Sequence, residues 1–382
     1  MQKRDYIFII SSFLIWRFLV IIFALLSTKF VPLFSNSYLG GGFSNYITNP
    51  VFWGHLNFDG EHYLSIAQNG YQPLQYFFFP FFPKLISYLT VVRTQIGFAW
   101  TGLIISNLSF VIALVGIYKL VKLDFDNMVA KLTIVLILVF PTSFYFGAYY
   151  NESIFLALII WSFYFARKNN FLFASILAGL ASATRIIGVI MFGALILEFL
   201  QQKKFKVKLG DFKDFWSILI SPFGLLLYMY YLLKKTGDSL IFLHQISVFG
   251  EQRSSMLITL PQVFYRYIFE ILPHVSYSYF PNVFTTYLEF ILTILFLIVI
   301  IFGIFKLRLS YSLFSVLAFI IPTLSGSFSS MPRYALVIFP IFIIVASYLN
   351  KLSKTYKYFV IFAMLILMVV STCMFWTGYW IS

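Results

Sequence analysis

The densest cluster of chemically active side chains lies at residues 57–63, which read Asn-Phe-Asp-Gly-Glu-His-Tyr. It brings Asp59, Glu61 and His62 within four residues, in a chain that has only 13 acidic residues. A carboxylate here can act as a general base that takes a proton from a hydroxyl group. The same three side chains could instead bind a divalent cation. Asp59 could also simply cap the helix that the apolar pattern after it predicts.

Four other ionisable residues are candidates for the site. Glu152, Arg185 and Arg333 lie where predicted apolar segments begin or end, whereas Arg253 lies within a long predicted outer segment, 234–283. Ionisable groups near a membrane are costly, and the default interpretation is a functional one. We therefore expect these four residues, together with Glu61 and His62, to contact the substrate. The arginines could anchor the chain at the interface by extending their charged ends to water. Alternatively, they could bind the phosphate of an anionic lipid or, for Arg253, a sugar. In the segment that reads TGDSLIFLHQ from Thr236, we interpret Asp238 or Ser239 as a helix cap.

Several classes of protein are excluded by composition and by absent motifs. Hydrophobic residues make up 61% of the 382 residues and charged residues only 10%, whereas soluble domains carry roughly a quarter. The single cysteine, Cys373, allows no disulfide within the chain. No Walker loop, dinucleotide fingerprint or H-E-x-x-H sequence is present. The composition therefore predicts a polytopic membrane protein whose solvent is lipid.

Apolar segments long enough to cross a bilayer recur along the chain and predict an all-α protein with about eleven transmembrane helices in one domain, residues 1–382. The predicted segments are 6–28, 97–120, 129–148, 152–167, 171–184, 187–201, 214–233, 284–305, 310–329, 334–350 and 357–380. The two segments beside Arg185 are short, so a single helix with a buried arginine is an alternative.

The distribution of basic residues decides between these alternatives and accounts for the net charge of +14. If the N-terminus is cytoplasmic and Arg185 lies in an outer turn, most lysines and arginines fall in cytoplasmic joins, as the positive-inside rule requires. A single helix over 171–201 would place the lysine-rich segment 203–213 outside. We therefore favour two helices, and we expect no nucleic-acid partner.

Two predicted outer segments, 29–96 and 234–283, are too long to be simple joins, and long ordered loops are usually functional. The first contains 76–92, an aromatic run with two prolines that predicts a helix lying in the membrane interface. No internal repeat is evident. The alternative function is a flippase or transporter of lipid-linked glycans. Such a protein would have polar residues at the bilayer midplane on broken helices, whereas the acids here cluster in the predicted outer loops.

The first-loop sequences FDGEHYLSIAQNGY and YFFFPFFPKL resemble the signature of the PIG-V family, the GPI mannosyltransferase II-like proteins, together with its prokaryotic relatives. Segments resembling the family recur in the same order to the end of the chain: PTSFYFGAYYNESIFLAL, ATRIIG, TGDSLIFLHQ and MPRYALVIFPIF. The first-loop block is the most specific of them. Phe58 departs from the tryptophan found in many members, which changes an aromatic wall and not the base.

The resemblance implies a GT-C glycosyltransferase fold with large extracytoplasmic loops, and the transfer of mannose. The donor would be a polyprenyl- or dolichyl-phosphate sugar, and the acceptor a lipid-linked or surface glycan, with inversion at the anomeric carbon. Asp59 matches the family's catalytic acid, and His62 the histidine that follows it. Arginines 185, 253 and 333 would offset the charge of the departing phosphate, so we expect neither a metal nor a cofactor. The site would face outward from a prokaryotic plasma membrane, or into the endoplasmic reticulum of a eukaryote.

Overall fold

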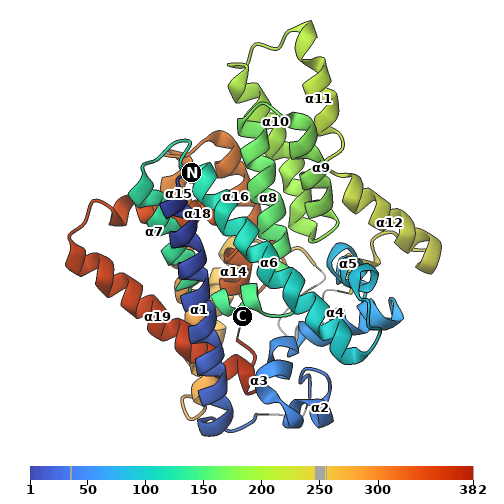
Figure 1. Cartoon of the computed structure of the whole chain (residues 1–382), viewed down its shortest axis with the longest axis vertical. Coiled ribbons are helices and arrows are strands. Elements are labelled where there is room, and N and C mark those ends of the chain that lie inside the picture. Colours follow the sequence, from blue (N-terminus) through green and yellow to red (C-terminus); the bar gives the residue numbers. More distant parts are fainter. Residues whose placement is uncertain (35–36, 246–253, 255, 382) are drawn as a thin grey trace.

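The computed structural model describes residues 1–34, 37–245, 254 and 256–381, and in these ranges the regular structure is helical throughout, with no β-strand (Figure 1). The helices of the N-terminal half are α1 Lys3–Phe30, α2 Phe43–Thr48, α3 Pro50–Trp53, α4 Asp59–Asn69, α5 Phe81–Leu89, α6 Gln95–Val121, α7 Asn127–Leu138, α8 Glu152–Arg167 and α9 Phe171–Ser182. Those of the C-terminal half are α10 Ile190–Gln202, α11 Phe212–Ile218, α12 Phe223–Thr236, α13 Ile241–His244, α14 Leu260–Arg266, α15 Phe280–Ile304, α16 Leu309–Thr323, α17 Met331–Ala335, α18 Phe339–Leu349 and α19 Lys354–Trp376.

Each predicted apolar segment contains a helix, which confirms the all-α class. In the described ranges, 5 helices are long and apolar enough to cross a membrane: α1, α6, the α11–α12 pair, α15 and α19. The other apolar helices are shorter, such as α9 and α16. This set of apolar helices is that of a multi-pass integral membrane protein.

Proline explains most of the boundaries that the sequence placed wrongly. The predicted segment 129–148 is helical only to Leu138, because Pro141 offers no backbone N–H to continue the helix. Within the segment 334–350, α17 ends at Ala335 and a new helix, α18, begins at Phe339, with Pro340 in its first turn. Pro222 separates α11 from α12 in the same way. Of the predicted interfacial helix 76–92, only residues 81–89 are helical.

The chain turns at Arg185, as the distribution of basic residues indicates. The helix α9 ends at Ser182, and α10 begins at Ile190 after a 3₁₀ turn at Ile186–Val189. The two-helix interpretation is therefore confirmed, and the single long helix with a buried arginine is wrong. Arg185 itself lies outside both α-helices, with an extended backbone.

The centre of the protein is formed by α6 packed against α8 and against the segment that precedes α8. Glycines allow the close approach: a Cβ on Gly102 would lie 2.1 Å from the Tyr149 ring, and one on Gly116 would lie 2.7 Å from Ile160. This contact fixes the start of α8, where Glu152 is the first residue.

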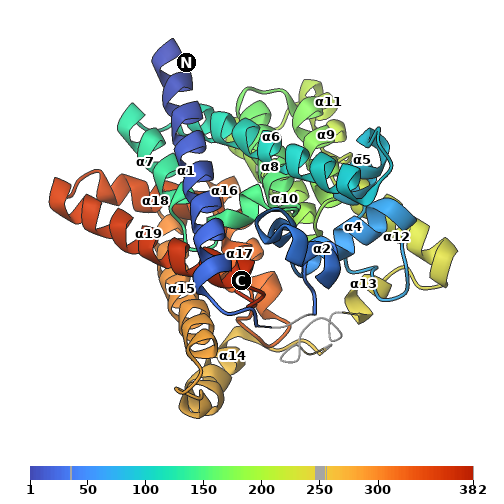
Figure 2. The same cartoon turned by 60° about the horizontal axis from the view of Figure 1, so that its bottom comes forward.

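The first-loop helix α2 lies near the C-terminus of the chain, which is marked C in Figure 2. Hydrogen bonds join these distant parts of the sequence. The Tyr46 hydroxyl donates to the carbonyl of Trp376 over 2.5 Å, and the Asn57 amide donates to the carbonyl of Phe375 over 2.9 Å. The first loop is thus part of the packed body and holds a defined position at one end of it.

Candidate functional site

Asp59 is the first residue of α4, and the residues before it hold it in place. The Asn57 side chain accepts a hydrogen bond from the Gly40 N–H over 2.9 Å, and the Asn57 carbonyl accepts one from the Tyr150 hydroxyl over 2.5 Å. Phe58 has a φ of 59°, which is unusual for a bulky residue. Such backbone strain persists where surrounding contacts impose it, and it clusters at functional sites.

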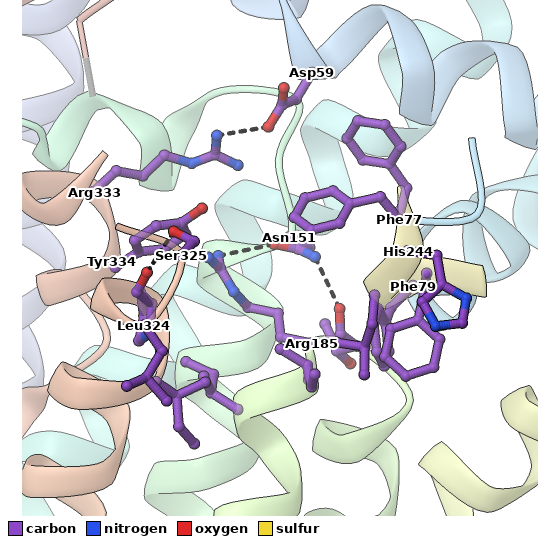
Figure 3. Close-up of a pocket in the computed structure, with 18 of the residues that line it drawn as sticks. Asp59, Phe77, Phe79, Asn151, Arg185, His244, Leu324, Ser325, Arg333 and Tyr334 are labelled. Carbon is purple, nitrogen blue, oxygen red and sulfur yellow. Dashed lines mark hydrogen bonds and ion pairs between the residues drawn. The ribbon is translucent and has the colours of Figure 1, made fainter. Parts of the chain in front are cut away.

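Asp59 belongs to a chain of alternating charges drawn from four segments of the sequence, and Figure 3 shows its first pair, Asp59 with Arg333. Arg333 Nη1 lies 2.6 Å from Asp59 Oδ2, and Arg333 Nε lies 2.6 Å from Glu152 Oε1. Arg185 Nη1 lies 2.8 Å from the same Glu152 oxygen. The order along the chain of charges is therefore Asp59, Arg333, Glu152, Arg185, with two negative and two positive side chains.

Glu152 and Arg333 are the buried members of this chain. The Glu152 side chain is fully buried, and Arg333 is 5% exposed. The Arg333 guanidinium carbon lies 4.9 Å from the ring centre of Tyr145 and 4.7 Å from that of Tyr150, so both rings stabilise the cation. Buried charges are tolerated when they are paired, and here a single carboxylate holds both arginines.

A cavity of about 490 Å³ opens beside this network, a size typical of small-ligand sites. Its polar lining includes Asp59, Asn151, Arg185 and Arg333. The remaining lining is largely apolar and aromatic, and it includes Phe77, Phe79, Ile186, Ile187, Phe242, Met256, Leu257, Ile321, Pro322 and Leu324. The cavity therefore joins a charged end to an apolar wall, which suits a ligand that has a charged head and a lipid tail.

Three of the site residues predicted from the sequence line this cavity: Asp59, Arg185 and Arg333. Glu152 does not line the cavity, but it forms ion pairs with both Arg185 and Arg333. Arg253 lies outside the described residues.

Glu61 is not among the residues that line the cavity, and it accepts a hydrogen bond from the backbone N–H of Gly41. Burial raises the pKa of its carboxyl group to about 7, while the Gly41 N–H acts in the opposite direction. Glu61 therefore connects α4 to the glycine-containing loop before α2, where it can stabilise that loop.

His62 stacks on Phe78, with ring centres 4.8 Å apart and an interplanar angle of 22°. Burial lowers the pKa of its imidazole, and the negative charge of Asp59 partly opposes this effect. Asp59, Glu61 and His62 thus have three different partners and do not converge on one point. In the described part of the chain, no three His, Cys, Asp or Glu side chains are grouped so as to hold a metal ion.

Two residues near the site were not identified from the sequence. Glu289, within α15, is 6% exposed and accepts a hydrogen bond from the Ser330 N–H over 3.0 Å. Ser330 directly precedes α17, the helix that contains Arg333. The sequence feature that could have identified Glu289 is an acidic residue inside an apolar segment.

The second residue, His244, lines the cavity, and its Nδ1 lies 2.7 Å from Asp238 Oδ2. The sequence suggested only a helix cap for Asp238, because a spacing of six residues in a loop does not reveal a side-chain pair.

No protein-family model and no curated protein matches the chain. Among solved structures, ArnT from Cupriavidus metallidurans bound to undecaprenyl phosphate matches with a TM-score of 0.52 and 11% identity, over 96% of this chain and 76% of ArnT. The Archaeoglobus fulgidus oligosaccharyltransferase in its apo form matches with a TM-score of 0.48 and 14% identity, over 95% of this chain. The chain spans only 56% of the length of that oligosaccharyltransferase. The likeness to ArnT shows that the chain has the GT-C fold, as predicted.

Proposed function

We propose that this protein is a membrane glycosyltransferase that moves a sugar from a polyprenyl- or dolichyl-phosphate donor to a glycan or glycolipid acceptor with inversion. The observation that supports this most is the convergence of Asp59, Arg185 and Arg333 on one cavity with an apolar wall. The fold it shares with ArnT, whose structure was solved with undecaprenyl phosphate, supports a lipid-phosphate donor.

Arg185 is the residue that we assign to the donor phosphate. One of its terminal nitrogens binds Glu152 and Asn151, at 2.8 and 3.1 Å. Its other terminal nitrogen, Nη2, and its Nε have no hydrogen-bond partner in the described ranges, while the side chain lines the cavity. A guanidinium with free donors beside a cavity is suited to bind a phosphate and to stabilise the charge that builds up on it as the bond to the sugar breaks.

Asp59 is the residue that we assign as the base. Its Oδ2 is paired with Arg333, whereas its Oδ1 has no hydrogen-bond partner in the described ranges, and the residue lines the cavity. In the proposed reaction, the acceptor oxygen forms a bond to the anomeric carbon and its proton passes to Asp59. The bond between that carbon and the phosphate oxygen breaks, and the phosphate leaves with the electron pair. Arg333 keeps the carboxylate oriented.

The sugar and the side of the membrane are further parts of the proposal. The first-loop resemblance to the PIG-V family supports mannose, and the distribution of basic residues supports a site facing outward from a prokaryotic plasma membrane. A transporter of lipid-linked glycans would need its polar groups on broken helices at the midplane. Asp59 instead comes from the start of a helix in the first loop.

This function can be tested with the protein in right-side-out vesicles. The donor is undecaprenyl-phosphate mannose, a membrane glycolipid extract supplies the acceptor, and the measurement is the release of free undecaprenyl phosphate. Arg185→Met should raise the KM for the donor roughly 10- to 100-fold, because hydrogen bonds to a charged group contribute about 1.5–3 kcal/mol. Arg93→Met, which removes an arginine whose one hydrogen bond among the described residues is to the Ser87 carbonyl, should leave the KM unchanged. No release by the wild type from any lipid-phosphate sugar would contradict the function, and release only in inside-out vesicles would reverse the orientation.

A further inference from the structure

At the end of the cavity away from Arg333, the lining includes His244, which is paired with Asp238 behind it. In Figure 3, His244 lies beside Phe79 and across the cavity from Arg333. It is the last residue of α13, and its Nδ1 lies 2.7 Å from Oδ2 of Asp238, in the turn after α12. Asp238 also accepts a hydrogen bond from the Leu240 N–H over 2.8 Å, which fixes the carboxylate. The imidazole is therefore held in a defined orientation.

This geometry leaves one ring nitrogen of His244 for a ligand. A carboxylate partner at Nδ1 requires that nitrogen to carry its hydrogen. The Nε2 atom has no hydrogen-bond partner in the described ranges, and His244 lines the cavity. A hydroxyl group can donate to this nitrogen when the imidazole is neutral and accept from it when the imidazole is charged. A hydroxyl is thus a suitable ligand in either protonation state.

The side chains around His244 favour a sugar ring over a phosphate. Phe77, Phe79 and Phe242 also line the cavity, and the last two are buried and packed against each other with ring centres 5.4 Å apart. Aromatic side chains supply apolar contact for the C–H groups of a pyranose ring. The carboxylate of Asp238 beside the imidazole would repel a phosphate.

We infer that His244, oriented by Asp238, binds a hydroxyl group of the donor sugar and that Phe77 and Phe79 pack against the sugar ring. This inference rests on the proposed function. With the phosphate at Arg185 and the lipid tail along Ile321 and Leu324, the sugar ring extends toward the aromatic end. His244 then distinguishes a sugar-bearing lipid from the bare lipid phosphate that remains after transfer.

The test compares the dissociation constants of the purified protein for undecaprenyl phosphate and for undecaprenyl-phosphate mannose. The wild type should bind the sugar-bearing lipid more tightly. His244→Ala should weaken binding of the sugar-bearing lipid by roughly three- to tenfold, the value of a neutral hydrogen bond, and leave binding of the bare lipid unchanged. His244→Asn should restore part of the affinity, because an amide also bonds a hydroxyl.

The control is His274→Ala, which removes another exposed histidine, one bonded to the Glu270 carbonyl, and should change neither affinity. The His244 side chain is 65% exposed, so its removal should not unfold the protein. An equal loss for both lipids would make His244 a phosphate contact. Unchanged affinities together with slower transfer would place an acceptor sugar there instead.

The inference would be overturned by an equal loss of affinity for both lipids, or by unchanged affinities with or without slower transfer. It would also be overturned if the wild type bound the two lipids with equal affinity. If the wild type bound neither lipid, the proposed function itself would fail. The failure of the sugar contact and the failure of the function are therefore distinguishable.

Discussion

Asp59→Asn should reduce the rate of sugar transfer by about 10²- to 10⁴-fold, the usual contribution of a general base. The asparagine side chain keeps the size of the aspartate and can still accept the hydrogen bond from Arg333, but it cannot take a proton from the acceptor hydroxyl. Arg333 also retains its 2.6 Å bond to Glu152, so the arginine is not left unpaired. The measurement is release of undecaprenyl phosphate per folded molecule.

Two controls separate loss of the base from loss of the structure. The affinity for undecaprenyl phosphate should be nearly unchanged in Asp59→Asn, because we assign the phosphate to Arg185. Glu270→Gln makes the same acid-to-amide change at a side chain that is 61% exposed, and it should transfer at the wild-type rate. Near-normal turnover by Asp59→Asn would remove Asp59 as the base.

Glu152→Gln should have the second-largest effect, and it should act on stability as well as on transfer. The wild-type carboxylate is fully buried and is bonded to Arg185 and Arg333 through one oxygen. Without its charge, the buried guanidinium of Arg333 and the partly buried one of Arg185 lose their shared counter-ion. Breaking a buried ion pair on one side costs about 3–5 kcal/mol. We expect a lower thermal midpoint in detergent, and slower transfer because Arg333 is held less firmly beside Asp59 once its charged partner is gone.

Glu198→Gln is the matched control for this prediction. Glu198 is also fully buried, and it is bonded to Arg308 through both carboxylate oxygens, at 2.8 and 3.0 Å, in a network that none of the cavity residues joins. Its variant should lose comparable stability yet keep full activity per folded molecule. If Glu152→Gln matched the wild type in both properties, Glu152 would have no positioning role.

The helical framework could be predicted because hydropathy reports burial in lipid directly. Every predicted apolar segment contains a helix, and the turn at Arg185 followed from the distribution of lysines. Boundaries were less certain, since a proline inside an apolar run, such as Pro141 or Pro222, ends a helix without changing its hydropathy.

The members of the site could be predicted more readily than their partners. Asp59, Arg185 and Arg333 were identified by type and place, but Asp59 and Arg333 are 274 residues apart in the sequence, and no local pattern joins them. Glu61 shows a different limit. It follows Asp59 by two positions on α4, which rotates it by about 200° around the helix axis and away from the cavity.

Burial and loop geometry account for what the sequence did not reveal. We expected Glu152 to contact the substrate, but its full burial behind the arginines arises from the packing of α8 against α6. The contact of Glu289 with the Ser330 N–H and the pairing of His244 with Asp238 both depend on how loops return to the body of the protein. Such contacts follow from tertiary structure and not from periodicity.

The anomeric configuration of the transferred sugar tests the central claim most directly, and it can be read from the product by nuclear magnetic resonance. A single displacement, in which Asp59 takes the acceptor proton on one face and the phosphate departs from the other, must invert the configuration of the donor. We expect an α-linked product from a β-linked lipid-phosphate mannose. A product that retains the donor configuration would require a covalent intermediate or two displacements, and it would contradict the roles assigned to Asp59 and Arg185.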